Sequence, residues 1–326
     1  MFKAVWLEQV DGATKASVCQ LNDDALGEGE VTVDVQWSTL NYKDALAITG
    51  RSPVVRRFPL VPGIDLAGTV VDCNNQDFVV GQTVVLNGWG HGESLPGGLA
   101  AKARVPAKHL TALPAPLTTR QAMSIGTAGY TAALCVQALE SAGVMPEQGE
   151  VLVTGANGGV GGFAIALLAQ RGYRVVASTG RPEESARLTA LGASRVITRE
   201  TLASAGKPLQ KELWSGVVDS VGSHTLANAC AQTQYGGAVA ACGLAQGMDF
   251  PATVAPFILR GVRLLGVDSV MAPAPVRDSA WKRLADCLSA TVIDAMTAEI
   301  SLDAVPAAAL DLLAGRVAGR LLVRTN

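Results

Sequence analysis

A glycine-rich segment in the middle of the chain has the residue types and the spacing to bind a dinucleotide. Residues 151–153 form a short apolar run, and Gly155, Gly158 and Gly161 follow before an apolar helical stretch. In such a strand–turn–helix unit, the first glycine permits a tight turn, the second lets the backbone approach a pyrophosphate, and the third lets the helix pack on the strand. The free N–H groups at the helix start then favour the negative charge of phosphates. The spacing differs from the stricter G-x-G-x-x-G pattern, so a purely structural turn is the alternative.

The next predicted strand, residues 173–178, completes a βαβ unit and ends in residues that favour NADPH. At this point a carboxylate usually binds the ribose 2′-hydroxyl of NAD. Here the strand ends in Ser178-Thr179-Gly180-Arg181, where an arginine suits a 2′-phosphate and the two hydroxyls can add donors. In the alternative, Arg181 is a solvated residue at a helix start, and Glu183 or Glu184 binds the ribose.

Length and composition describe an α/β protein of two domains. The chain has 326 residues, of which 49% are hydrophobic and 17% charged, and its net charge of −2 gives no basic surface for nucleic acid or anionic membranes. We find no apolar run of the roughly 18 residues that a membrane span requires, and no signal-peptide core at the start. The six cysteines are scattered without a C-x-x-C pair, which predicts buried free thiols in a reducing cytoplasm.

The hydrophobic patterns divide the chain into a mainly-β first part and an alternating α/β second part. Strands are predicted in the first part at Phe2–Leu7, Glu30–Leu40, Leu66–Asp72, Thr83–Leu86 and Ala100–Val105. A helix or helix pair at 124–142 follows, and strands and helices then alternate through 151–267. This alternation predicts a doubly wound parallel sheet of about six strands. The last residues, with strands at 297–301 and 320–323, are expected to return to the first domain.

Several motifs along the chain resemble those of the medium-chain dehydrogenase/reductase superfamily. They are Leu40–Asp44, Pro62–Val70, Gly126–Ala132, the glycine-rich turn and Leu191–Ala193. The combination of Asn-Tyr-Lys-Asp, Gly-Thr-Ala-Gly and Ser-Thr-Gly-Arg resembles the zinc-free acryloyl-CoA reductase branch, whose members are also named quinone oxidoreductases. The resemblance implies a GroES-like mainly-β domain at 1–122 and 270–326, and a Rossmann NADPH-binding domain at 123–269. It also implies a homodimer that reduces acryloyl-CoA to propionyl-CoA.

The same resemblance implies a set of residues that contact NADPH. They are Tyr42, Gly158, Gly159, Val160, Gly161, Ser178, Thr179, Gly180, Arg181, Arg199, Leu244, Ile258 and Ser269. A further contact is expected near Arg316, although the segment Ala314-Gly315-Arg316 lacks the asparagine that the family pattern suggests.

The positions that hold zinc in other members of the superfamily carry residues that do not bind metal. A cysteine is expected where this chain has Ser38–Asn41, and His-Glu where it has Ile64-Asp65. Only Gly88–Gly98 occupies the place of the four-cysteine lobe, and the three histidines are too dispersed for ligand spacing. The sequence therefore predicts no metal.

Without a metal to hold an alkoxide, an activated double bond is a more suitable substrate than an alcohol. A hydride added to the β-carbon of an α,β-unsaturated carbonyl moves charge to the carbonyl oxygen, and a proton then reaches the α-carbon. Asn41, Tyr42 and Asp44 are the candidate catalytic residues: Tyr42 as a donor, and Asp44 as an acid if burial raises its pKa. In the alternative, Asp44 caps a helix and pairs with Lys43, while cofactor hydroxyls or water deliver the proton.

Arginines near this cluster suggest a surface for the phosphates of CoA. Arg51, Arg56 and Arg57 lie close together, and Arg324 at the tail is expected to join them, although a solvated loop explains the same residues. Two other functions stay open: an NADPH-dependent quinone or enone reductase that does not use the arginines, and a protein that binds NADPH without turnover.

Overall fold

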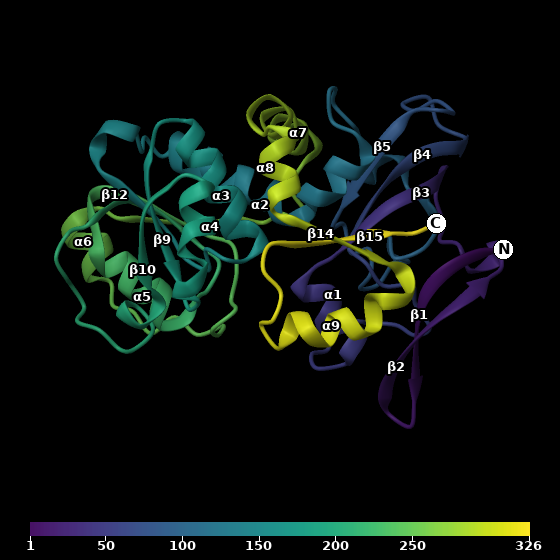
Figure 1. Cartoon of the computed structure of the whole chain (residues 1–326), viewed down its shortest axis with the longest axis horizontal. Coiled ribbons are helices and arrows are strands. Elements are labelled where there is room, and N and C mark those ends of the chain that lie inside the picture. The colour runs from purple at the N-terminus through teal and green to yellow at the C-terminus, as the bar shows by residue number, and fades with distance from the viewer. The chain divides into compact units, whose positions relative to one another are not determined.

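The computed structural model describes every residue from Met1 to Asn326, and the chain folds into two compact units (Figure 1). The first unit comprises Met1–Thr127, Val270–Ala285 and Ser289–Asn326, and the second comprises Ala128–Ser269 and Asp286–Leu288. The first boundary between the units lies between Thr127 and Ala128, inside helix α2 (Thr119–Ser141). Just before this boundary Gly126 leaves the helical conformation, with φ 52° and ψ −162°.

The second unit is built on a parallel sheet of six strands. Its strands are β8 (Glu150–Val153), β9 (Arg174–Thr179), β10 (Ala193–Thr198), β11 (Trp214–Asp219), β12 (Thr233–Ala241) and β13 (Arg263–Gly266). Their order, β10-β9-β8-β11-β12-β13, confirms the predicted doubly wound sheet. Its helices are α3 (Gly159–Gln170), α4 (Ser185–Ala190), α5 (Ser223–Gln232) and α6 (Ala255–Arg260). The strand order reverses between β8 and β11, the point at which such sheets bind ligands beyond the carboxyl ends of their strands.

The first unit is organised around a largely antiparallel sheet, with a separate two-stranded hairpin. The hairpin consists of β1 (Phe2–Val10) and β2 (Ala13–Leu21). The sheet contains β3 (Val31–Leu40), β4 (Asp65–Cys73), β5 (Thr83–Asn87), β6 (Lys102–Val105), β7 (Leu110–Ala112), β14 (Thr297–Ser301) and β15 (Arg320–Arg324). The helices are α1 (Tyr42–Thr49), α7 (Ala274–Cys287, whose last two residues belong to the second unit), α8 (Ala290–Ala295) and α9 (Val305–Leu313).

The end of the chain returns to the first unit and pairs with its third strand. β15 lies antiparallel to β3, with Leu321 opposite Leu40, so the yellow C-terminal strand lies beside the purple N-terminal part of the sheet in Figure 1. This pairing places Arg320, the first residue of β15, close to the end of β3, where α1 begins.

Several elements differ from the sequence prediction. β2 and α1 were not predicted, although the turn before β2 carries the Asp-Gly pair typical of hairpins; Asp11 and Gly12 have φ angles of 51° and 79°. The segment 238–242 lies in the interior of the sheet, because β12 pairs with β11 on one side and with β13 on the other. All six cysteines are free as predicted, although only Cys135 and Cys230 are fully buried.

Helix α2 corrects the expectation that no apolar stretch is long enough to cross a membrane. Its 23 residues pass that test by length and composition, but 83% of the most apolar part is buried inside the protein. Core helices of globular proteins have the same properties, so this helix is weak evidence for a membrane span.

Candidate active site

The glycine-rich turn of the second unit leaves no room for side chains at two of its three glycines. Gly155 has φ +60°, and a Cβ there would lie 2.4 Å from the Ser220 hydroxyl oxygen. A Cβ on Gly161 would lie 2.4 Å from the Gly155 carbonyl oxygen, so only glycine lets α3 pack this closely on the turn. Gly158 precedes α3 as its N-cap, and the first N–H groups of the helix have no acceptor within it. This geometry fits the pyrophosphate of a dinucleotide.

Two arginines flank the end of β9, where the ribose of the cofactor is expected. A Cβ on Gly180 would lie 2.7 Å from Arg199 Nε, so the guanidinium group passes directly over this glycine. The parallel pairing of Thr198 with Thr179 brings Arg199 to this place. Thr179 Oγ1 accepts hydrogen bonds from the Arg181 backbone N–H at 3.0 Å and from Asn157 Nδ2 at 2.7 Å. Thr179 therefore shapes the turn that carries Arg181, a role that the sequence did not reveal.

The other predicted cofactor residues have varied environments. Ser178 is buried at 2% exposure, whereas Leu244 and Ile258 are 56% and 73% exposed on the second unit. Ser269 is half-buried. Arg316, in the first unit, donates from Nε to Asp311 at 3.0 Å, so its charge is already paired.

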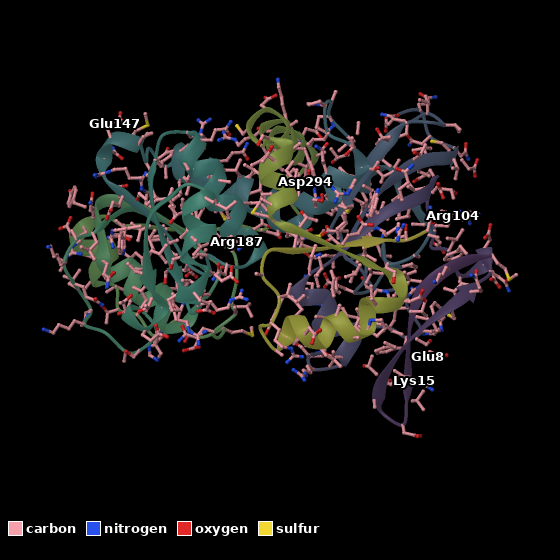
Figure 2. The ribbon with its side chains drawn as sticks, in the orientation of Figure 1. Glu8, Lys15, Arg104, Glu147, Arg187 and Asp294 are labelled. Atoms are coloured by element: carbon pink, nitrogen blue, oxygen red, sulfur yellow. The ribbon has the colours of Figure 1, made fainter.

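Arg187 on α4, labelled in Figure 2, was not predicted and adds positive charge near Arg181. Both of its terminal nitrogens are buried without a hydrogen-bond partner. Burial lowers the pKa of Arg187, and the Arg181 charge lowers it further, while Glu184 opposes the shift. The positive potential at this end of the sheet favours a dianion such as a 2′-phosphate.

In the first unit, Asn41 is the centre of a buried charge cluster formed by Asn41, Asp44, Asp65 and Arg320. Asn41 Nδ2 donates to Asp44 Oδ2 at 3.0 Å and to Asp65 Oδ2 at 2.8 Å, while its Oδ1 accepts from Arg320 Nη1 at 3.1 Å. A flipped amide would turn its oxygen toward two carboxylates and its N–H groups toward a guanidinium, so the charges fix its orientation. Because these contacts occupy both amide atoms, Asn41 is better placed to hold the site than to bind substrate.

Asp44 is enclosed and caps the first turn of α1. Its carboxylate accepts from the backbone N–H groups of Asn41 at 2.8 Å and Ile64 at 3.0 Å, and the residue is 1% exposed. Burial, and secondly the Asp65 charge, raise the pKa of Asp44 to about 7, while the N–H donors oppose the shift. The helix-capping alternative for Asp44 is thus confirmed. Its pairing with Lys43 is wrong, because Lys43 Nζ lies 2.9 Å from Glu93 Oε1.

Tyr42 differs from its neighbours because its side chain reaches solvent. It is the first residue of α1 and is 49% exposed, between the buried Asn41 and the ion-paired Lys43. Its backbone is held by the capped helix turn while its phenol stays accessible. Of the three candidate catalytic residues, the geometry therefore favours Tyr42 for contact with ligands.

The four arginines predicted for CoA do not share one environment. Arg51, Arg56 and Arg57 are exposed in the loop after α1. Arg57 lines a hollow of about 390 Å³ that also contains Asp24 and Glu28, whose charges disfavour phosphate. Arg324 lies on β15, with Nε 3.7 Å from Glu299 Oε1, so a carboxylate already accompanies it.

The structure brings two histidines together that the sequence separates. His91 Nδ1 lies 2.7 Å from the Pro96 carbonyl oxygen, which can only accept, so this nitrogen carries the proton. His91 Nε2 must then accept from His109 Nδ1, which lies 3.1 Å away. Trp89 stacks on His109 with ring centroids 5.1 Å apart. No group of three or more His, Cys, Asp or Glu side chains is placed to hold a metal ion.

This histidine pair predicts a loss of stability in mild acid. Burial, followed by repulsion from His91, lowers the pKa of His109 to about 4, and burial also lowers the pKa of His91. An unfolded histidine has a pKa near 6.5, so below that pH the unfolded chain binds more protons than the folded one. The histidine pair therefore contributes a loss of stability as the pH falls from about 6.5 to about 4, opposite in sign to the contribution of Asp44, whose pKa is raised to about 7. His109→Gln should reduce this contribution to the pH dependence of the melting temperature, and His224→Gln should not; equal curves for both variants would contradict the assignment.

Comparison with known proteins places the chain in a family. It matches the zinc-binding dehydrogenase family over residues 159–290 and the alcohol dehydrogenase GroES-like domain over residues 27–115. It is 53% identical over 324 residues to the probable acrylyl-CoA reductase AcuI of Escherichia coli K12, covering 99% of this chain and 100% of the relative. The chain belongs to the AcuI/YhdH family of medium-chain dehydrogenases/reductases.

A second relative and a solved structure support this placement. The acrylyl-CoA reductase AcuI of Ruegeria pomeroyi is 49% identical, covering 100% of both chains. The crystal structure of E. coli K-12 YhdH with bound NADPH matches with a TM-score of 0.97 and 53% identity, covering 99% of this chain and 100% of the other. The family relation confirms the Rossmann and GroES-like fold class predicted from the motifs.

Proposed function

We propose that this protein reduces acryloyl-CoA to propionyl-CoA with NADPH, adding a hydride to the β-carbon without a metal. The observation that carries the proposal is the full-length likeness to acrylyl-CoA reductases at 53% and 49% identity. Two features support NADPH as the cofactor. They are the glycine-rich turn, whose close packing fits a dinucleotide, and the arginines beside Gly180.

The residues of the second unit would hold NADPH, which supplies the hydride when bound. The N–H groups at the start of α3 would bind the pyrophosphate, with Gly158, Gly159, Val160 and Gly161 giving the backbone close access. Arg181 and Arg199 would bind the 2′-phosphate through charge-assisted hydrogen bonds. Leu244, Ile258 and Ser269 remain proposed contacts on the same unit, and Tyr42 and Arg316 on the first.

The first unit would contribute Tyr42 to the chemistry. After hydride addition the negative charge resides on the thioester oxygen, and a phenol O–H placed there would stabilise it by donating a hydrogen bond. The α-carbon then takes a proton from Tyr42 or from water, which completes the saturated product. Asn41 and Asp44 would act by fixing the helix turn that carries Tyr42.

The proposal is tested by following NADPH absorbance with acryloyl-CoA, crotonyl-CoA and a simple quinone, with EDTA present and NADH as the control cofactor. We expect EDTA-resistant oxidation of NADPH with acryloyl-CoA. Turnover of the quinone but of neither thioester would move the function to quinone reduction. Tight NADPH binding without turnover of any acceptor would indicate a binding protein.

The arginines after α1 give a prediction about the CoA moiety. If Arg56 and Arg57 bind its phosphates, the double variant Arg56→Ala with Arg57→Ala should raise KM for acryloyl-CoA about 10-fold or more, since a hydrogen bond to a charged group contributes roughly 1.5–3 kcal/mol. The KM for a free enone, which has no phosphates, should stay unchanged. Steady-state kinetics with both substrates measures this, and equal losses on both would reject the phosphate contact. Arg51 and Arg324 are the remaining candidates for the same role.

We further propose that the protein is a cytoplasmic homodimer. β13 forms an open edge of the parallel sheet, where Leu264 is 37% exposed, and the neighbouring α6 exposes Leu259 at 62%. An unpaired edge with apolar neighbours suits association of two copies about a two-fold axis. Analytical ultracentrifugation that finds a single 33.5 kDa species would contradict it.

A further inference from the structure

We propose that Arg320 is a positioning residue for the reaction. Its buried guanidinium holds Asn41, and through Asn41 the first turn of α1, in the orientation that presents Tyr42. The inference rests on the proposed role of Tyr42, and it names a residue that no motif in the sequence indicates.

The guanidinium of Arg320 is fixed by three acceptors on two segments, the junction between β3 and α1 and the first part of α2. Nη2 donates to Thr39 Oγ1 at 2.7 Å, Nη1 to Asn41 Oδ1 at 3.1 Å, and Nε to the Ser124 carbonyl oxygen at 3.3 Å. Arg320 is 4% exposed, and its backbone N–H donates to Met296 O at 2.8 Å. A planar group with this many fixed partners has one orientation, so it can determine the position of the Asn41 amide.

The backbone around the guanidinium is shaped to admit it. A Cβ on Gly126 would lie 2.6 Å from Arg320 Nη2 and 3.0 Å from Asp65 Oδ2. Gly126 also has a positive φ of 52°. The next residue, Thr127, donates its backbone N–H to Asp65 Oδ2 at 2.9 Å. The Gly-Thr pair thus makes space for Arg320 and closes the cluster around Asp65.

The charges of the cluster require a cation at this place. Asp44 and Asp65 are two buried carboxylates, and the Asn41 amide donates to both while it accepts from Arg320. Removal of the guanidinium would leave Asn41 Oδ1 without its partner and the carboxylates without the nearby positive charge. Because the amide and Asp44 also cap α1, the first turn of that helix would lose its fixed orientation.

This arrangement corresponds to the positions that the family resemblance associates with zinc. Ser38–Asn41 and Ile64-Asp65 do come together: Ser38 Oγ donates to the Asp65 carbonyl oxygen at 2.8 Å, and Asn41 Nδ2 contacts the Asp65 carboxylate. In this chain a guanidinium supplies the fixed positive charge there. Unlike a metal ion it is covalently attached, so a chelator cannot remove it.

If Arg320 had a purely structural role, its replacement would lower stability without a specific effect on turnover. The test therefore separates a structural role from a positioning role. We expect Arg320→Lys to lower kcat about 100-fold, because a displacement of about 1 Å at a reacting group has an effect of that size. KM for acryloyl-CoA and the dissociation constant of NADPH should change less than about 3-fold, since Arg320 is proposed to act on the chemical step rather than on ground-state binding. In Arg320→Ala, added guanidinium chloride at millimolar concentration should restore part of kcat and should not activate the wild type.

The control is Arg120→Ala, which removes an exposed arginine of the same unit whose Nη1 lies 2.7 Å from Asp294 Oδ1. It should leave kcat unchanged, because exposed ion pairs contribute little. If Arg320→Ala does not fold, Thr39→Val leaves the guanidinium one acceptor short and should lower kcat at unchanged KM. Wild-type kcat in folded Arg320→Lys or in Thr39→Val would overturn the proposal, as would a loss in Arg320→Ala that guanidinium does not reverse.

Hydrogen exchange separates failure of this inference from failure of the proposed function. Peptides covering residues 38–50 should exchange faster in Arg320→Lys than in the wild type, while peptides from the second unit should not change. If the wild type does not reduce acryloyl-CoA but residues 38–50 loosen as expected, the substrate assignment fails and the positioning role stands. Unchanged exchange in those peptides would reject the positioning role whatever the substrate.

Discussion

Replacing Arg181 by alanine is expected to weaken NADPH binding about 10- to 100-fold, because a hydrogen bond to a charged group contributes roughly 1.5–3 kcal/mol. The affinity for NADH should change little, since NADH has no 2′-phosphate. The ratio of the NADPH affinity to the NADH affinity would therefore fall by nearly the same factor as the NADPH affinity. Fluorescence titration of both cofactors measures it without a substrate. Arg199, whose Nε lies 2.7 Å from the place of a Gly180 Cβ, should show a similar but separate effect when replaced by alanine.

The control for Arg181 is Arg171→Ala, an exposed arginine of the same unit that is paired with Glu140. It should leave both affinities unchanged. If Arg181 binds the 2′-phosphate, the wild type should not prefer NADH, and Arg181→Ala should not weaken the binding of both cofactors equally. Either of those results would favour the alternative in which Glu183 or Glu184 binds the ribose. In that case, Glu183→Gln or Glu184→Gln should weaken the binding of NADH.

Gly161→Ala is expected to abolish measurable NADPH binding while most of the fold persists. Its Cβ would lie 2.4 Å from the Gly155 carbonyl oxygen and 2.7 Å from Ala156 Cα, and neither backbone atom can move without displacing the turn. Overpacking of this kind destabilises by roughly 1–3 kcal/mol, and the displaced N–H groups would no longer face the pyrophosphate. Isothermal titration with NADPH and circular dichroism measure the two effects separately.

The matched control for Gly161 is Gly172→Ala, just beyond the other end of α3. Gly172 has φ +83° but no atom within 4 Å of its Cβ position, so alanine there adds backbone strain without a clash. Stability should fall while NADPH affinity stays the same. Normal NADPH affinity in folded Gly161→Ala would show that the turn does not bind the pyrophosphate.

Local patterns in the sequence were sufficient to predict the second unit. The informative patterns each involve residues only a few positions apart: the glycine spacing, the alternation of strands and helices, and the residues after β9. They correctly predicted the doubly wound sheet. The prediction that no zinc is bound rests on local information of the same kind, because a side chain such as Ile64 cannot ligate a metal in any fold.

The buried charge cluster could not be predicted, because its partners are distant in the sequence. Arg320 and Asn41 are 279 residues apart, and only the pairing of β15 with β3 brings them together. Similarly, His91 and His109 meet through loop packing rather than through a short ligand spacing. For α1 a local signal existed, since Asn41 and Asp44 stand in the N-cap and N3 positions of a capped helix. An eight-residue helix with little periodicity otherwise gives too weak a pattern.

Isotope labelling can follow the proposed hydride transfer from NADPH to the β-carbon of acryloyl-CoA. The enzyme would be incubated with acryloyl-CoA and NADPH deuterated at the transferring position, with EDTA present, and the product examined by NMR. We expect propionyl-CoA with one deuterium in its methyl group. With unlabelled NADPH in D₂O, we expect one deuterium at the α-carbon instead. Deuterium from the cofactor at the α-carbon, or no propionyl-CoA at all, would contradict the proposed transfer.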